Sequence, residues 1–284
     1  MRAMAVACLF MTHSDTSALL PLVEAWSTSA ESVLDLVTTL DEDQLATPTD
    51  LPGWTVRDIL AHLAHLESEL AGAPPTLADE SEIPADAVDD PFRAYTERGV
   101  AARRGRETSA LVAELRAAVD RLRDVLADPT PADPPASFPR PGTTWEPLLR
   151  DRTFDYWMHE QDIRRAIGQP GGWSSPGAML SLAVLRAALP YVVGKKVAPA
   201  AGTTVALTVE GPGWSDTVVV GVADDGRAHP SDRPAEEADV RLVMSAESFV
   251  LAGGGRRDPS ALDITVEGDP ALGQRLIAAL AVTP

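Results

Sequence analysis

The chain has 284 residues, of which 45% are hydrophobic and 23% charged, and its formal net charge is −18 at neutral pH. A chain of this length and hydrophobicity can bury one large core or two ordinary ones, so we expect a globular protein. The negative charge argues against nucleic-acid binding, which needs a basic face. An acidic substrate would need a local cationic pocket.

Cysteine occurs once, at Cys8, which excludes an internal disulfide and any zinc or redox motif built from cysteine pairs. The apolar run Met1 to Met11 is short for a signal peptide and lacks a small-residue cleavage pattern. We expect residues 1–16 to be a disordered tail or a start called too early, with Met11 as the alternative start. We find no other stretch near the ~18 apolar residues of a membrane span, so we expect no membrane association and a cytoplasmic protein.

Residues 17–172 are predicted to form four amphipathic helices. In the first three of them apolar residues recur at steps of three and four positions, whereas the inward stripe of the fourth, with Arg152, Asp155, His159 and Asp162, is too polar for an ordinary core face. The helices span about residues 19–40, 55–70, 92–126 and 145–167, with Gly99 and Gly105 weakening the first half of the third. Two Pro-rich segments, 73–90 and 129–141, are expected to be surface connections. Helices joined in this way predict a four-helix bundle.

Residues 173–284 have a different character and predict a small α+β domain with an antiparallel or mixed sheet. A helix is expected from Pro176 to about Val193, a short one after Ser245 and a final one after Asp269. Between them lie four stretches in which apolar residues alternate with polar ones, as in half-buried strands. Their inward-facing candidates are Val205, Leu207 and Val209; Val218, Val220 and Val222; Val240, Leu242 and Met244; and Ile264 and Val266.

The fourth helix carries Asp155 and His159, four residues apart. At 3.6 residues per turn both side chains lie on one face of the helix. A carboxylate and an imidazole that point the same way can be two ligands of a divalent metal. A third ligand has to come from elsewhere in the chain.

His62 is the best candidate for the third ligand. Thr55 and Asp58 form the pattern of a helix N-terminus, and His62 then falls on the apolar stripe of the helix, facing inward. His65 competes with His62, but we expect it nearer the polar edge of the helix. The sequence therefore predicts a metal site made of His62, Asp155 and His159.

Less specific interpretations exist for each of these residues. A single inward histidine is more often a hydrogen-bonded core residue, and an Asp/His pair four residues apart is more often a surface ion pair. Arg152 and Asp162 flank the pair by one turn and either support the ligands or form surface salt bridges. Four further residues are expected to be solvated or, for the arginines, to bind an anion: His13, His229, Arg256 and Arg257.

Two segments, GWTVRDILAHL at 53–63 and WMHEQDIRRAIGQP at 157–170, resemble the mycothiol-dependent maleylpyruvate isomerase family. The closing segment VEGDP at 266–270 and the helix after it also fit. The resemblance implies a DinB-like four-helix metal-binding domain followed by a domain similar to sterol carrier proteins. It also implies a divalent metal, usually zinc, held by His62, Asp155 and His159. Many members have Glu where this chain has Asp155, so the metal would lie closer to the helix or a water would bridge.

The family pattern implies a reaction in which a low-molecular-weight thiol such as mycothiol is the nucleophile and a small electrophilic molecule is the substrate. Isomerisation and S-transfer are both consistent with it. Two alternatives remain open, a non-catalytic module that binds a small ligand and a thiol-independent, metal-assisted hydrolase. The sequence contains no serine hydrolase elbow. It assigns neither a catalytic residue besides the ligands nor an oligomeric state.

Overall fold

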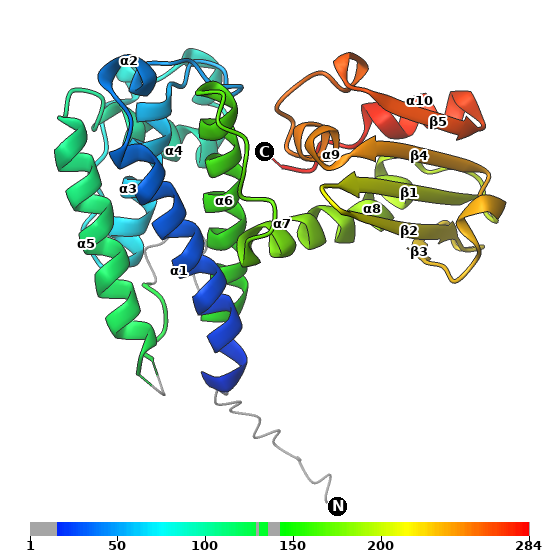
Figure 1. The fold of residues 1–284 in the computed structure, drawn as a ribbon, viewed down its shortest axis with the longest axis horizontal. Helices are drawn as coiled ribbons and strands as arrows, with labels where there is room; N and C mark the ends of the chain where they lie inside the picture. The colour runs from blue at the N-terminus through cyan, green and yellow to red at the C-terminus, as the bar shows by residue number, and fades with distance from the viewer. Residues whose placement is uncertain (1–15, 129–130, 136–142, 284) are drawn as a thin grey trace, which may run out of the picture.

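The computed structural model describes residues 16–128, 131–135 and 143–283. The chain forms a helical half and a half built on a five-stranded sheet, which lie side by side (Figure 1). The expectations for residues 1–15, and for most of 129–141, fall outside the described residues. The boundary expected between residues 172 and 173 stays a prediction.

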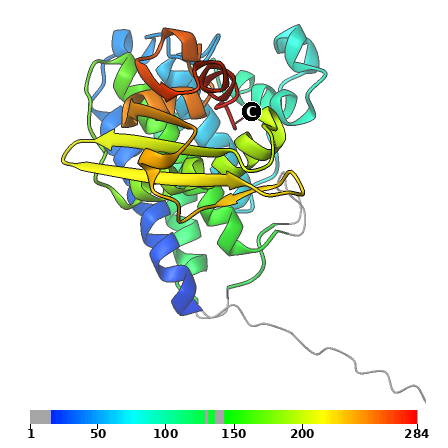
Figure 2. The same cartoon turned by 90° about the vertical axis from the view of Figure 1, so that its right-hand side faces the viewer.

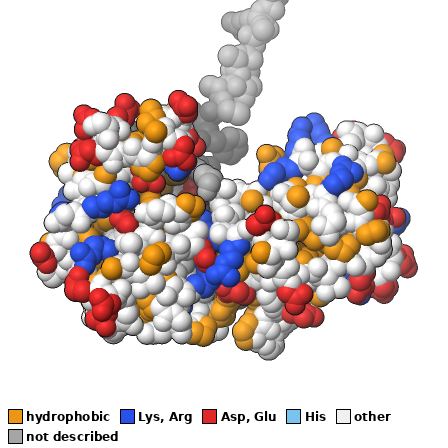
Figure 3. All heavy atoms as spheres, turned by 90° about the horizontal axis from the view of Figure 1, so that it is seen from above, with side chains coloured by type: hydrophobic (Ala, Val, Ile, Leu, Met, Phe, Trp, Pro, Cys, Tyr) orange, Lys and Arg blue, Asp and Glu red, His pale blue; other side chains and the backbone are white. Residues whose placement is uncertain are grey.

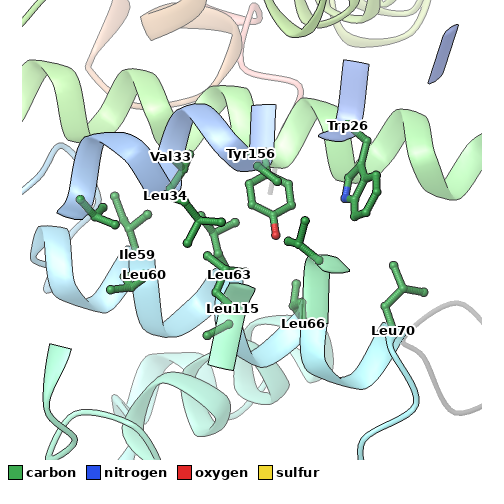
Figure 4. Close-up of a cluster of buried hydrophobic side chains, with 14 of the residues drawn as sticks. Trp26, Val33, Leu34, Ile59, Leu60, Leu63, Leu66, Leu70, Leu115 and Tyr156 are labelled. Carbon is green, nitrogen blue, oxygen red and sulfur yellow. The ribbon is translucent and has the colours of Figure 1, made fainter. Parts of the chain in front are cut away.

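Four long helices of the first half pack as the predicted bundle. They are α1 (Thr16–Thr38), α3 (Val56–Leu70), α5 (Thr108–Leu126) and α6 (Trp145–Ala166). Helix α6 packs along α1, and α5 packs along α3. Trp26 from α1 and Tyr156 from α6 point into the core that these helices enclose (Figure 4), and both are fully buried. The fold class predicted for this half is confirmed.

Helix α3 begins where the sequence indicates. The Thr55 side chain accepts a hydrogen bond from the Asp58 backbone N–H, and the Asp58 carboxylate accepts one from the Thr55 backbone N–H. This reciprocal cap satisfies two of the backbone donors that a helix N-terminus leaves free. The short helix α2 (Glu42–Leu45), capped in the same way by Asp41, leads into the turn before α3. The start of α3 fixes where His62 lies.

The third predicted helical region is two helices rather than one. The first is α4 (Pro91–Ala101), and the second, α5, begins only at Thr108. The loop between α3 and α4 contains 3₁₀ turns at Glu80–Glu82 and Ala85–Ala87. Helix α4 packs against α3 on the side that carries His65. His65 is therefore completely buried, and the prediction that it lies near the polar edge is wrong.

The sheet of the second half is mixed, with strand order β3-β2-β1-β4-β5. The strands are β1 (Thr204–Gly211), β2 (Trp214–Val222), β3 (Ala228–Pro230), β4 (Val240–Ser245) and β5 (Ile264–Gly268). β1 and β4 are parallel, and the other neighbours are antiparallel. The four predicted stretches are β1, β2, β4 and β5, and their inward candidates are buried or half-buried. The short β3 has no alternating pattern and was not predicted.

Helices cover one face of this sheet (Figure 2). They are α8 (Leu189–Tyr191), the π-helical turn Val192–Val197, α9 (Ala246–Gly253) and α10 (Pro270–Ala278). Helix α7 (Pro176–Ala187) leads into them and packs mainly against α6 and α1 of the bundle, and 3₁₀ turns lie at Ala235–Glu237 and Pro259–Ala261. The other face carries cross-strand polar pairs, Thr208 with Thr217 and Arg241 with Glu267. Such a sheet, apolar on one side and polar on the other, fits the alternation seen in the sequence.

Helix α6 belongs to both halves. Tyr156 lies in the core of the bundle, whereas Trp157 and Met158 lie in the core of the second half. The Trp157 indole donates to the Gly172 carbonyl oxygen at 3.1 Å and meets Trp173 edge to face. His159 follows directly, so it stands where the two cores meet.

One helical segment, Pro176–Val197, is long and apolar enough by composition to cross a membrane, with a mean hydropathy of 1.5 over its most apolar window. We expected no stretch of this kind. About two fifths of the window (39%) is buried in the protein, and buried core helices of soluble proteins meet the same criterion. The expectation of no membrane association therefore stays a prediction.

We predict that Gly99→Ala destabilises the protein although alanine favours helices by about 1 kcal/mol over glycine. A Cβ on Gly99 would lie 2.0 Å from the His65 ring, inside its van der Waals surface. Overpacking of this kind costs about 1–3 kcal/mol, which outweighs the helix propensity. Urea unfolding of Gly99→Ala beside Gly105→Ala, where a Cβ meets nothing within 4 Å, measures the difference. Equal stability of the two variants would show that the two helices are not packed this closely.

Candidate metal centre

His62 on α3 and the pair Asp155 and His159 on α6 converge on one point. The Nε2 atom of His62 lies 3.3 Å from Oδ2 of Asp155, and Nε2 of His159 lies 3.4 Å from Oδ1. One ligand atom from each residue lies within 4.8 Å of the others. The imidazole rings are 4.9 Å apart and meet edge to face. The structure thus brings together the three residues that the sequence singled out, of which His62 and Asp155 are 93 positions apart in the chain.

The donor set fits a divalent metal. Ligand atoms at about 2.0–2.2 Å from a tetrahedral zinc are about 3.3–3.6 Å from one another. Oδ1 of Asp155 lies 3.5 Å from Nε2 of His62 and 3.4 Å from Nε2 of His159, which is within this range. Both histidines are buried, while the Asp155 side chain is 28% exposed, so the donors can be reached from its side. The shorter Asp155 side chain reaches both imidazoles directly at these spacings. No bridging water is needed to bring its carboxylate into the group.

A buried arginine holds the Asp155 carboxylate. Arg152 donates from Nη1 to Oδ2 of Asp155 at 2.6 Å, and from Nε and Nη2 to Glu67 at 3.0 and 2.8 Å. Glu67 is itself completely buried and accepts a hydrogen bond from the Trp26 indole. Burial alone would raise the pKa of Asp155, but His62, Arg152 and His159 outweigh it and hold the pKa well below its ordinary value. Asp155 is therefore a carboxylate at neutral pH.

A second buried carboxylate orients His159. Oδ2 of Asp162 lies 3.2 Å from Nδ1 of His159, and Asp162 is fully buried. Burial would raise the pKa of Asp162, but His159, Arg256 and Arg165 lower it to about 2, so Asp162 is ionised and can only accept. Nδ1 therefore carries the proton, and Nε2 is left facing Asp155. This carboxylate and histidine arrangement is common behind metal ligands.

Trp54 forms one wall of the site, a role that the sequence analysis missed. Its ring lies 5.2 Å from that of His62 and is stacked 6.1 Å from that of His159. The indole nitrogen donates to Glu97 of α4 at 3.0 Å, which fixes the ring. Trp54 was cited only within the segment that carries the family resemblance, although a tryptophan just before the start of the helix that carries a candidate ligand was a usable signal.

The remaining candidates lie apart from the three donors. His65 is buried beside Tyr95 and 3.3 Å from Glu69 of its own helix, so it does not compete as a ligand. His229 lies exposed in β3, and His13 falls outside the described residues. Arg256 was expected to be exposed, but its side chain is only 8% exposed and pairs with Asp162, so that prediction is wrong. Arg257 is half exposed and pairs with Asp50.

Replacing Arg152 by methionine should destabilise the metal-free protein by about 3–5 kcal/mol, because Glu67 then keeps a buried charge without its partner. The matched control is Arg150→Met on the same helix, where the pair with Glu146 is exposed and contributes about 0.5 kcal/mol or less. Guanidinium unfolding of the wild type and both variants, after any bound metal has been removed with a chelator, gives the two losses in free energy of unfolding. A loss of similar size in both would mean that Arg152 is solvated.

The buried His65 predicts an acid-sensitive fold. Burial, then the charges of Arg103, His62 and Arg152, lower its pKa from 6.5 to about 3. Between these values the unfolded chain binds a proton that the folded one does not, so stability falls with falling pH by up to about 1.4 kcal/mol per unit. His65→Gln should reduce the slope between pH 6 and 4 by this contribution, whereas His229→Gln on exposed β3 should leave the slope unchanged. Urea unfolding at each pH measures the free energy of unfolding. An unchanged pH dependence of this free energy in His65→Gln would contradict the assignment of the slope to His65.

The comparisons with known proteins agree with this architecture. Residues 26–164 match the family model described as the mycothiol maleylpyruvate isomerase N-terminal domain, and residues 179–275 match the MDMPI C-terminal domain. Crystal structures of the mycothiol-dependent maleylpyruvate isomerase and of its histidine-to-alanine variant are 16% and 15% identical, with TM-scores of 0.49 and 0.50. Each comparison covers 89% of this chain and 95% of the other. No curated protein sequence matches.

At 15% identity, the similarity to the histidine-to-alanine variant structure shows only that the two proteins share a fold. The two family models follow one another along the chain in the order of the helical and sheet halves and match most of its length. All three converging donors lie in the N-terminal match, and Arg256 lies in the C-terminal one. The chain therefore belongs to the mycothiol-dependent maleylpyruvate isomerase family.

Proposed function

We propose that the protein is a metal-dependent enzyme in which a low-molecular-weight thiol, mycothiol or a close analogue, is the nucleophile. The reaction is isomerisation or S-transfer on a small electrophilic substrate. The observation that carries the proposal is the convergence of His62, Asp155 and His159 at spacings suited to one metal ion. Family membership supplies the thiol and the class of reaction.

His62, Asp155 and His159 would hold the metal, with zinc the ion that two imidazoles and one carboxylate suit. A divalent metal in this position supplies the means to keep a bound thiol deprotonated near neutral pH. Three protein donors, rather than four, are typical of catalytic sites. The donor set and its burial therefore favour a catalytic centre over a structural one.

The surrounding residues prepare the site without taking part in bond formation. Arg152 holds one oxygen of Asp155, which leaves Oδ1 directed to His159. Asp162 fixes the ring of His159, and the Trp54 ring excludes water on one side. The exposed edge of Asp155 is the side from which thiol and substrate reach the donors.

The test compares metal content and thiol response in the wild type, Asp155→Ala, His159→Ala and, as a matched control, His229→Ala on exposed β3. We expect zinc in the wild type and the control, none in the other two, and stabilisation by mycothiol only when zinc is bound. With maleylpyruvate, the substrate named for the solved relative, turnover should need both zinc and thiol. A thiol that is regenerated indicates isomerisation, and one that is consumed indicates S-transfer.

Two outcomes would contradict the proposal. Turnover that needs zinc but no thiol would identify a metal-assisted hydrolase. A wild type that neither contains nor takes up metal would favour the ligand-binding module, with His62 and His159 as hydrogen-bonded core residues.

A further inference from the structure

A single arginine from the second half reaches the back of the candidate metal centre. Nε of Arg256 lies 3.1 and 3.2 Å from the two oxygens of Asp162, and Nη2 lies 3.0 Å from Oδ2. That same Oδ2 lies against Nδ1 of His159. Arg256, Asp162 and His159 therefore form one continuous chain of contacts from the loop after α9 to the three converging donors.

The geometry points to Arg256 as a positioning residue for His159, through which the second half of the protein sets the metal affinity of the first. This inference rests on the proposed function, because it takes His159 to be a metal ligand. Arg256 touches none of the three donors itself. It acts by fixing the plane of the Asp162 carboxylate.

Charge balance alone does not explain Arg256. Asp162 already pairs with Arg165, three residues along the same helix. Arg165, however, also contacts Asp50 and Glu247 and binds only Oδ1 of Asp162. The guanidinium of Arg256 instead contacts both oxygens side-on, and such a two-point contact fixes orientation as well as charge. The Arg256 contact therefore holds Oδ2 of Asp162 toward Nδ1 of His159.

The loop that carries Arg256 is built for close approach to α6. A Cβ on Gly254 would lie 2.5 Å from Met158, the residue before His159, and 2.9 Å from the Val250 carbonyl oxygen. The Arg256 backbone N–H donates to the Leu251 carbonyl, and Nη1 donates to the Gly254 carbonyl at 2.8 Å. The arginine is thus fixed by its own loop before it meets Asp162, so little side-chain freedom is lost in the contact.

The neighbouring Arg257 provides a matched comparison. It also joins the two halves, through Asp50 at 3.0 Å, but its side chain is 49% exposed and it has no contact with Asp162 among the described residues. Acidic and basic side chains gather at the surface where the halves meet (Figure 3), as such exposed pairs require. If the second half affected the metal site only by packing against the first half, Arg256→Ala and Arg257→Ala would weaken zinc binding equally.

The experiment measures zinc affinity by competition with a chromophoric chelator, on full-length protein stripped of metal. Residues behind metal ligands typically change the affinity about 10- to 100-fold, and we expect Arg256→Ala to weaken zinc binding about 10-fold. Arg256→Lys, which keeps the charge but not the two-point contact, should fall between Arg256→Ala and the wild type. Arg257→Ala should bind zinc like the wild type.

A spectroscopic signature separates positioning from folding. The visible absorption of bound cobalt(II) reports the geometry of its ligands, so it should change in Arg256→Ala and Asp162→Asn but not in Arg257→Ala. Urea unfolding of the metal-free variants shows whether lost affinity merely follows lost stability. If Arg256→Ala does not fold, the comparison of Arg256→Lys with Arg257→Ala carries the test.

Three results would overturn the inference. The first is that Arg256→Ala and Arg256→Lys bind zinc as tightly as the wild type. The second is that Arg256→Ala and Arg257→Ala weaken zinc binding equally. The third is that the cobalt spectrum of Arg256→Ala is the same as that of the wild type. A wild type that binds no zinc would instead contradict the proposed function, and the inference would fall with it. The wild-type measurement thus tells the two failures apart.

Discussion

The structure around the site depends on one constraint: two imidazoles and one carboxylate lie close together inside a helical bundle. Such groups are costly to bury unless each keeps a charged or hydrogen-bonding partner. Asp155 has Arg152, which in turn has Glu67, and His159 has Asp162, which in turn has Arg165 and Arg256. Arg152, Asp162 and Arg165 come from α6 itself, whereas Glu67 comes from α3 and Arg256 from the loop after α9. His62 Nδ1 is the exception, being buried without a hydrogen-bond partner in the described chain.

Helix α6 carries this arrangement because it is shared by both hydrophobic cores. Tyr156 anchors it in the bundle, while Trp157 and Met158 anchor it beneath the sheet half. A helix held on both sides cannot rotate without disturbing one core, so the packing of the three residues between Asp155 and His159 fixes the direction of both side chains. Preorganisation of this kind is what a catalytic metal site requires of its scaffold.

The sequence predicts the parts of this structure that depend on local signals. The Thr55 and Asp58 cap places α3, and the four-residue spacing of Asp155 and His159 places both on one face of α6. His65 was misjudged because its burial depends on α4, whose position on α3 has no local signature apart from Gly99. Arg256 was misjudged for the same reason, since its partner Asp162 is 94 residues away in the sequence. Long-range ion pairs leave no periodic pattern to detect.

X-ray absorption of the zinc-loaded protein shows whether His62, Asp155 and His159 bind one zinc ion that a thiol can also reach. Without thiol, we expect only nitrogen and oxygen neighbours of the zinc at about 2.0–2.2 Å, including two imidazoles. On addition of mycothiol one sulfur should enter at about 2.3 Å. Zinc that shows no imidazole neighbours, or that gains no sulfur, would contradict the proposed function.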